Sequence, residues 1–224
     1  MILPLRQTLS PLVPKLLAPL PTPVEVGVPQ FGDGATSAAV TRTPGAAGNL
    51  ILVVGWADSN SAMSSGNLTD TNGNTWTLKQ LVTGSFSISI GVWYCFANAG
   101  STTINLVPDN PSDLCGMFVR EFIKVDSSQP ISALALVQNT GLTNTPGSGN
   151  FTTASDNNLL LGFLFQTYQS VTYTAPSGFT IDLGTSGDFS TEHGTAGGAG
   201  TYSVTFDTSD VIATAIAGIA LQGG

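Results

Sequence analysis

The stretch SISIGVWYCFA, residues 87–97, is the clearest indication of how this chain folds. Its apolar side chains recur at every second position, which is the period of a β-strand. One face would carry Ile88, Ile90, Val92, Tyr94 and Phe96, and the other Ser87, Ser89, Gly91, Trp93, Cys95 and Ala97. Because both faces are partly apolar, the pattern predicts a strand in the centre of a sheet.

Similar short runs of β-branched and aromatic residues continue from about residue 36 onward, separated by clusters of Gly, Asn, Asp and Ser. They predict strands at Ala38–Thr43, Asn49–Ala57, Thr75–Val82, Ser87–Ala97, Thr102–Val107, Leu114–Val125, Ala133–Gln138, Leu159–Tyr168, Phe179–Leu183, Thr201–Phe206 and Val211–Leu221. No window keeps a helical period for more than two turns. Residues 36–224 are therefore expected to form an all-β, antiparallel jelly-roll β-sandwich.

The chain also contains a weak internal duplication. The segment Gly48–Val53 is echoed by Asn157–Gly162, and the strand Cys115–Val125 by Ile212–Leu221. Two shorter pairs lie between them in the same order, Thr75–Leu78 with Gly178–Ile181 and Thr102–Leu106 with Thr201–Thr205. Because a jelly roll consists of two Greek keys, we interpret each repeat as one Greek key.

Residues 71–74, Thr-Asn-Gly-Asn, are the strongest local turn signal, because Asn-Gly suits both positive-φ positions of a type I′ turn. They are expected to close a hairpin. The same segment superficially resembles a calcium loop that begins at Asp70. An EF-hand needs Gly and Glu at its sixth and twelfth positions, where this chain has Thr75 and Leu81. A calcium site that uses Asp70 is therefore the lesser alternative.

Residues 1–35 differ from the rest, because seven of the 13 prolines fall within the first 30 residues. Prolines interrupt every apolar stretch, so a secretory signal is not expected. Proline alternating with Leu or Val predicts an extended, polyproline-like arm. The arm would either remain a flexible leader or dock on a partner or a neighbouring subunit, and we favour docking. The side chains expected to make the contact are Leu3, Leu5, Leu9, Leu12, Val13, Leu16, Leu17 and Leu20.

Charge is scarce, with 9% charged residues and a net charge of −8. The missing basic surface argues against nucleic-acid binding. No apolar run approaches the roughly 18 residues of a membrane-spanning helix. One histidine and few lysines leave little for acid–base catalysis, so we expect neither an enzyme nor a cofactor or metal.

Three sets of residues are candidates for chemistry. His193, beside Glu192, is expected to be an ordinary loop or strand-end histidine because no nucleophile motif accompanies it. Cys95 and Cys115 are expected to be free buried thiols, with a disulfide as the alternative. The charged group at the end of one predicted strand is expected to be solvated, with an intersubunit ion pair as the alternative, and consists of Arg120, Glu121, Lys124 and Asp126.

Most of the aromatic side chains lie within predicted strands, where packing in the core is the ordinary expectation. Tyr168 and Tyr173 are the exception, because they flank the predicted loop 169–172. They are the pair that we expect to be exposed and available to a ligand.

Five stretches together resemble a widespread bacterial and phage jelly-roll module. They are GNLILVVGWADSN (48–60), LTDTNGNTWTL (68–78), ISIGVWYCFANAGSTTINLV (88–107), CGMFVREFIKVD (115–126) and NNLLLGFLF (157–165). The resemblance extends over about residues 36–222. It is a pattern of strands and turns and contains no catalytic signature.

The resemblance implies a non-enzymatic structural component of a phage virion, as a head decoration, head fibre or tail-fibre module. The arm would anchor it and the sandwich would project outward. Its expected partners are further copies, with a homotrimer as the favoured assembly, and capsid or tail proteins, in a virion assembled in the host cytoplasm. The alternative is a carbohydrate-binding or adhesion module that recognises a host-surface glycan. Neither nucleic acid nor a membrane is expected as a partner.

Overall fold

A computed structural model describes residues 20–58, 63–83, 88–110, 114–166, 171–184, 186–196, 198–210 and 212–224. Within these ranges the paired strands are antiparallel, and the one helix is a short 3-10 turn at Ser65–Asn67. The predicted all-β, antiparallel sandwich is thus confirmed. Jelly-roll connectivity over residues 36–224 stays a prediction.

The first half of the chain forms one large and one small sheet. The large sheet has the order β1-β9-β4-β7-β6, and β2 also pairs with β9. The small sheet has the order β3-β8-β5. The strands are β1 (Val24–Glu25), β2 (Gln30–Gly34), β3 (Ala38–Arg42), β4 (Leu50–Ala57), β5 (Leu68–Asp70), β6 (Thr77–Thr83), β7 (Ser89–Phe96), β8 (Thr102–Leu106) and β9 (Cys115–Ile123).

The second half repeats this arrangement. Its large sheet has the order β10-β19-β12-β16-β14, and its small sheets are β11-β17 and β15-β13-β18. The strands are β10 (Ile131–Thr143), β11 (Phe151–Thr153), β12 (Leu159–Gln166), β13 (Val171–Thr174), β14 (Phe179–Leu183), β15 (Ser186–Gly187), β16 (Phe189–Thr195), β17 (Gly200–Tyr202), β18 (Asp207–Thr208) and β19 (Ile212–Leu221).

The two large sheets correspond strand for strand, since β2-β9-β4-β7-β6 matches β10-β19-β12-β16-β14. The predicted echoes fall on equivalent strands, with β4 matching β12 and β9 matching β19. The sequence interpretation gave each repeat one Greek key of a single sandwich. Instead, each repeat has its own large sheet with small sheets beside it, and the two large sheets face each other.

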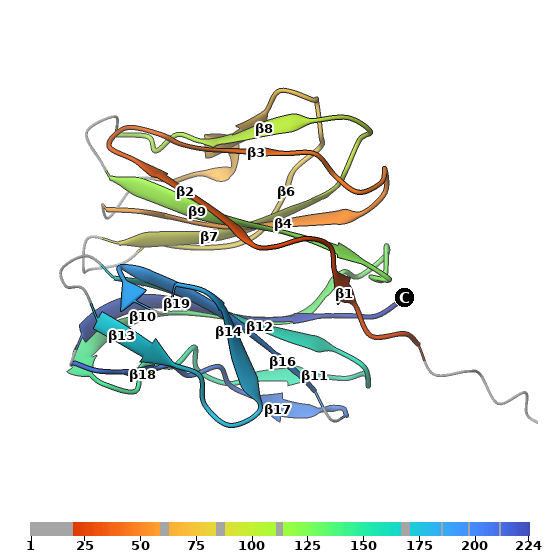
Figure 1. The fold of residues 1–224 in the computed structure, drawn as a ribbon. Helices are drawn as coiled ribbons and strands as arrows, with labels where there is room; N and C mark the ends of the chain where they lie inside the picture. Colours follow the sequence, from red (N-terminus) through yellow and green to blue (C-terminus); the bar gives the residue numbers. More distant parts are fainter. Residues whose placement is uncertain are drawn as a thin grey trace, which may run out of the picture.

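Three apolar cores hold these layers together. In Figure 1 the layers follow from top to bottom as β3 and β8, then β9, β4 and β7, then β10, β19 and β12, and finally β18 and β17. The central core lies between the large sheets and includes Leu52, Phe118, Phe163 and Ile219. Each half has a further core on the outer face of its large sheet. Because the large sheets are buried on both faces, their strands are nearly continuous apolar runs.

The strand at residues 87–97 behaves as expected. β7 lies between β4 and β6. Ile90 and Val92 face the central core, whereas Trp93 and Cys95 face the core of the first half. Its position in the centre of the sheet is confirmed.

The boundary predicted at residue 35 is wrong within the described residues. β1 and β2 both pair with β9, so that Val24 lies opposite Ile123 and Gly34 opposite Cys115. Residues 24–34 are therefore part of the large sheet. Of the apolar arm residues, Leu20 is described and is 46% exposed. The others, Leu3, Leu5, Leu9, Leu12, Val13, Leu16 and Leu17, lie outside the described residues.

Candidate functional site

Two adjacent charged residues, Arg120 and Glu121, lie inside β9 and point to opposite faces of the large sheet. Their exposed fractions are 0% and 1%. The prediction that they are solvated at a strand end is therefore wrong. The second half covers the face that carries Arg120, and the segment before β4 covers the face that carries Glu121. Lys124, beyond the end of β9, is exposed as expected.

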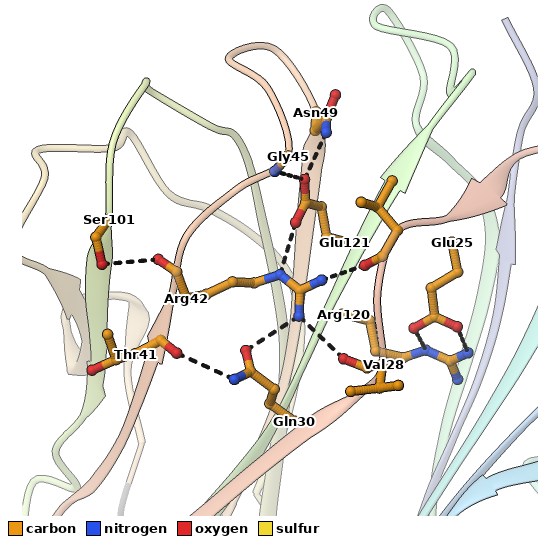
Figure 2. A network of polar contacts seen from close by, with 11 residues as sticks. Glu25, Val28, Gln30, Thr41, Arg42, Gly45, Asn49, Ser101, Arg120 and Glu121 are labelled. Atoms are coloured by element: carbon orange, nitrogen blue, oxygen red, sulfur yellow. Dashed lines mark hydrogen bonds and ion pairs between the residues drawn. The ribbon is translucent and has the colours of Figure 1, made fainter.

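Arg120 connects the two halves of the molecule. Its guanidinium donates two hydrogen bonds to Glu25 on β1, from Nε to Oε1 at 2.9 Å and from Nη2 to Oε2 at 2.6 Å (Figure 2). In the second half it forms an ion pair with Asp182 Oδ2 at 2.7 Å and donates to Thr191 Oγ1 at 2.9 Å. A fully buried cation therefore meets two carboxylates from two different elements.

The surroundings of Arg120 are otherwise aromatic. Its guanidinium carbon lies 5.6 Å from the ring centroid of Phe122 and 5.8 Å from that of Phe163. These distances permit cation–π attraction, which is strongest where water is excluded. Removing a charge from water is costly, so the arrangement depends on retaining both carboxylate partners.

Glu121 forms a second network on the opposite face of β9. It accepts hydrogen bonds from Arg42 Nε at 2.8 Å, from the Gly45 backbone N–H at 2.8 Å and from Asn49 Nδ2 at 2.6 Å (Figure 2). Burial by itself would raise the pKa of Glu121, but the hydrogen bonds from Asn49, Arg42 and Gly45 outweigh it and lower the pKa below its ordinary value. Glu121 is thus held as a carboxylate.

Arg42 extends this network to the segment between β1 and β2. It donates to the backbone oxygens of Val26 and Val28 and to the side chain of Gln30. One buried guanidinium therefore binds both β9 and the segment that leads into β2. These contacts help to hold residues 24–34 on the sheet although these residues include Pro29 and three glycines.

His193 lies within β16, and its side chain is 41% exposed. Its Nδ1 lies 2.6 Å from Asp182 Oδ1, whose other oxygen contacts Arg120. Glu192, its neighbour in sequence, lies on the opposite face of the strand, so it does not orient the imidazole. The loop position that the sequence suggested is wrong, because His193 is paired with Leu161 of β12 on one side and with Thr180 of β14 on the other.

Glu192 is fully buried, and neither carboxylate oxygen has a hydrogen-bond partner among the described residues. The Glu192 side chain fits because residue 162 is a glycine. A Cβ added at residue 162 would collide with the side chains of Glu192 and Val204. Burial, followed by the nearby charges of Asp182 and Asp207, raises its pKa from 4.5 to about 8. Glu192 is therefore mainly protonated at neutral pH.

The predicted hairpin at residues 71–74 is wrong. β5 pairs with β8 and β6 pairs with β7, so the segment between β5 and β6 crosses from one sheet to another. Gly73 has a φ of 66°, but Asn72 does not have the positive φ of a type I′ turn. Asp70 organises this corner by accepting hydrogen bonds from Asn72 N (2.6 Å), Asn74 N (3.3 Å), Trp76 Nε1 (2.6 Å) and Thr102 Oγ1 (3.2 Å).

These donors also affect the calcium alternative. Burial by itself would raise the pKa of Asp70, but the four hydrogen bonds lower it, so the carboxylate is satisfied by the protein itself. Among the described residues, no group of three or more His, Cys, Asp or Glu side chains could hold a metal ion.

The remaining candidates are the two cysteines, which match the sequence prediction, and the tyrosine pair, of which the described member does not. Cys95 and Cys115 are buried free thiols, as expected. Tyr173 is only 5% exposed and packs edge-to-face against Phe206 with ring centroids 6.5 Å apart, so its predicted exposure to a ligand is wrong. Tyr168 lies outside the described residues.

A cleft of about 320 Å³ lies where the two halves meet, and the sequence did not indicate it. The ends of β2 and β4 and the start of β9 form one side, and the end of β12 and the start of β16 form the other. Three aspartates, Asp33, Asp58 and Asp188, line it together with aromatic rings, and the described residues of its lining include no Lys or Arg. Phe31 and Phe189 stack across the two halves with ring centroids 3.6 Å apart.

The fold and these sites define an antiparallel β-sandwich protein with a repeated strand order and an acidic, aromatic cleft between its halves. Compared with known proteins, the chain matches no family model, no curated protein and no solved structure. Within the part of the chain that the structure describes, no helix has the length and apolar character needed to cross a membrane.

Proposed function

We propose that this protein is a non-enzymatic structural component of a phage virion, as a head decoration, head fibre or tail-fibre module. Residues 1–19 attach it to the particle and the double sandwich projects outward. It acts as a homo-oligomer with cyclic symmetry, with a trimer as the expected assembly, and joins the virion in the host cytoplasm.

The observation that supports attachment is the surface next to residues 1–19. Leu20, Val24 and Val28 are 46%, 44% and 74% exposed, and they continue the Pro/Leu composition of the preceding residues. They are three of the five large hydrophobic side chains found exposed within the described residues. Exposed apolar side chains that gather on one segment indicate a surface that another protein covers.

The end of the molecule that carries this surface also carries the last described residues. Gly223 lies against Pro21, and Val125 pairs with Gly223. The cleft lies at the other end of β9. A module with its attachment segment at one end can project its opposite end, which suits a fibre or a decoration protein.

Deletion of residues 1–19 tests the proposal more sharply than a longer deletion, because residues 24–34 belong to the sheet. Phage particles from the host that carries the gene would be purified and probed with an antibody against the folded body. We expect the full chain to copurify with particles and the deletion variant to stay in the soluble fraction with an unchanged circular dichroism spectrum. Incorporation of the deletion variant at the level of the full chain would contradict the proposal.

The carbohydrate-binding alternative depended on Tyr168 and Tyr173. With Tyr173 buried, the described residues no longer provide the exposed pair that it required. It stays a prediction, and glycan-array binding by the full chain is its direct test.

A further inference from the structure

The cleft between the halves combines two kinds of chemistry. Asp33 and Asp188 are exposed acidic groups on its two sides, one on β2 and the other just before β16. Leu114 belongs to its lining and is 52% exposed. A ligand that suits this site carries a positive charge on an apolar stem and has further apolar groups beside it.

The chain itself contains such a ligand. Residues 1–19, MILPLRQTLSPLVPKLLAP, include Arg6 and Lys15 and no acidic residue, which gives them a charge of +2 within a chain of net charge −8. Leu5 precedes Arg6, and Leu16 and Leu17 follow Lys15. Two of the other four basic residues, Arg42 and Arg120, are buried in the networks around β9 and are not available. The segment therefore complements the cleft in charge and in apolar character.

The positions of the two ends decide between a cleft on the same chain and one on a neighbour. Val24 pairs with Ile123 at one end of β9, whereas Leu114 and Cys115 line the cleft at the other. The length of β9 separates these ends by about 27 Å. Lys15 is five residues from Leu20, and five residues would span about 16 Å as polyproline, which is too short to bring Lys15 into the cleft of its own chain. Arg6, 14 residues from Leu20, is not excluded in this way, so it is Lys15 that requires a neighbouring copy. Contact between the arm end of one copy and the cleft end of the next also covers exposed apolar side chains on both.

We propose that the cleft is the docking site for residues 1–19 of a neighbouring copy of this chain. The side chain of Lys15 enters between Asp33 and Asp188, and the adjacent leucines pack on Leu114 and the aromatic rings. This inference rests on the proposed attachment role of residues 1–19 and identifies what they attach to. The contact is head-to-tail, so it generates a closed ring or a filament and not a two-fold dimer.

Sedimentation of the full-length protein over a range of concentrations tests the proposal. We expect concentration-dependent association that salt weakens. The cleft variant Asp33→Asn/Asp188→Asn and the arm variant Arg6→Gln/Lys15→Gln should each weaken association by about tenfold or more. Lys15→Gln alone should account for most of this loss, and Arg6→Gln alone should not. The matched control, Asp207→Asn/Lys79→Gln, also removes exposed charges but lies away from the cleft and should associate like the wild type.

Mixing the two variants provides the sharpest test. The cleft variant has an intact arm and the arm variant has an intact cleft, so a mixture should form pairs that do not grow further. Monomeric wild type at every concentration, unchanged association of the cleft variant, or a mixture that forms no pairs would overturn the proposal. A glycan that binds the wild type but not the cleft variant, with self-association equal in the two proteins, would also overturn the proposal, because the cleft would then be a glycan site.

Particle incorporation separates this inference from the proposed function. If the protein is absent from particles but the variants behave as described, the virion role fails and the arm–cleft contact stands. If the protein enters particles and the cleft variant associates like the wild type, the virion role stands and the arm–cleft contact fails.

Discussion

Gly48-Asn49-Leu50 before β4 and Asn157-Asn158-Leu159 before β12 have the same local geometry. Gly48 and Asn157 have φ values of 87° and 63°. The backbone oxygen of Asn49 accepts a hydrogen bond from the backbone N–H of Ala97 at 2.8 Å, and that of Asn158 accepts one from Ala196 at 3.0 Å. Leu50 therefore corresponds to Leu159, and strand pairing extends the correspondence to the other strands.

The halves differ most at the position of Trp93 in the first half and Glu192 in the second. Trp93 lies opposite Val53, and Glu192 opposite Gly162. Both are fully buried, and each has a side-chain polar atom without a hydrogen-bond partner among the described residues. The same strand order therefore accommodates an indole or a protonated carboxyl at one position. The local glycine pattern, and not the fold, decides which of them fits.

A second difference lies on the last strand of each half. Arg120 and Glu121 correspond to Ile219 and Ala220, because Leu50 pairs with Phe122 and Leu159 with Leu221. The second half shows that apolar residues suffice at these positions. The charges of the first half instead join β9 to segments that its strand ladder does not, since they bind the segment before β4 and the second half.

The largest expected effect comes from the pH dependence of Glu192. The folded protein holds a proton, with a pKa of about 8, that the unfolded chain releases near 4.5. The free energy of unfolding should therefore fall as the pH rises from 4.5 to 8, by at most about 5 kcal/mol, and level off above that. Urea unfolding at several pH values measures the slope.

Glu192→Gln is the control for this slope, because an amide does not titrate. The variant should lose the pH dependence between 4.5 and 8 while keeping the strand order. Trp93, at the equivalent position in the first half, does not titrate and so adds no pH dependence to the free energy of unfolding. Equal slopes for the wild type and Glu192→Gln would show that another group is responsible.

Arg120→Ile places in the first half the residue that the second half has at the same position. We expect a loss of about 4 kcal/mol, because Glu25 and Asp182 would be left as uncompensated carboxylates near the core. The triple variant Arg120→Ile/Glu25→Gln/Asp182→Asn removes those charges and should recover at least half of the loss. A single variant within about 1 kcal/mol of the wild type would contradict the role of Arg120. Chemical denaturation at neutral pH measures the free energy of unfolding of the single and the triple variant.

Glu121→Ala is the corresponding exchange on the other face of β9, because Ala220 stands there in the second half. It leaves the Arg42 guanidinium, the Gly45 N–H and the Asn49 amide without their acceptor, and we expect a loss of about 3 kcal/mol. Glu121→Gln retains an acceptor and should lose less than half as much. If both variants unfold at the same urea concentration as the wild type, the network contributes nothing to stability.

The sequence predicted the long central strands because their apolar runs are sufficient evidence of burial. The sequence did not predict β16, because FSTEHGT is polar. The strand is nevertheless buried, since it lies between two neighbouring strands, contacts Arg120 and places Glu192 in the space left by Gly162. An Arg-Glu pair flanked by apolar residues in CGMFVREFI was a usable signal of buried charge. Its partners could not be inferred, because Glu25 is 95 residues from Arg120 and Thr191 is 71. The cleft likewise combines separate strand ends that carry no shared motif.

The smallest expected effect concerns Gly48 and Asn157, the residues that align the two halves. No atom lies within 4 Å of a Cβ added at Gly48, so a substitution there is limited by its φ of 87° and not by space. Asn tolerates the left-handed region better than other non-glycine residues, because its short polar side chain can bond locally. Gly48→Asn should therefore cost less than about 0.5 kcal/mol and Gly48→Ala about 1 kcal/mol, and thermal unfolding of the two variants measures the difference. If Gly48→Asn costs as much as Gly48→Ala, the backbone at residue 48 does not accommodate Asn in the way that the backbone at residue 157 does.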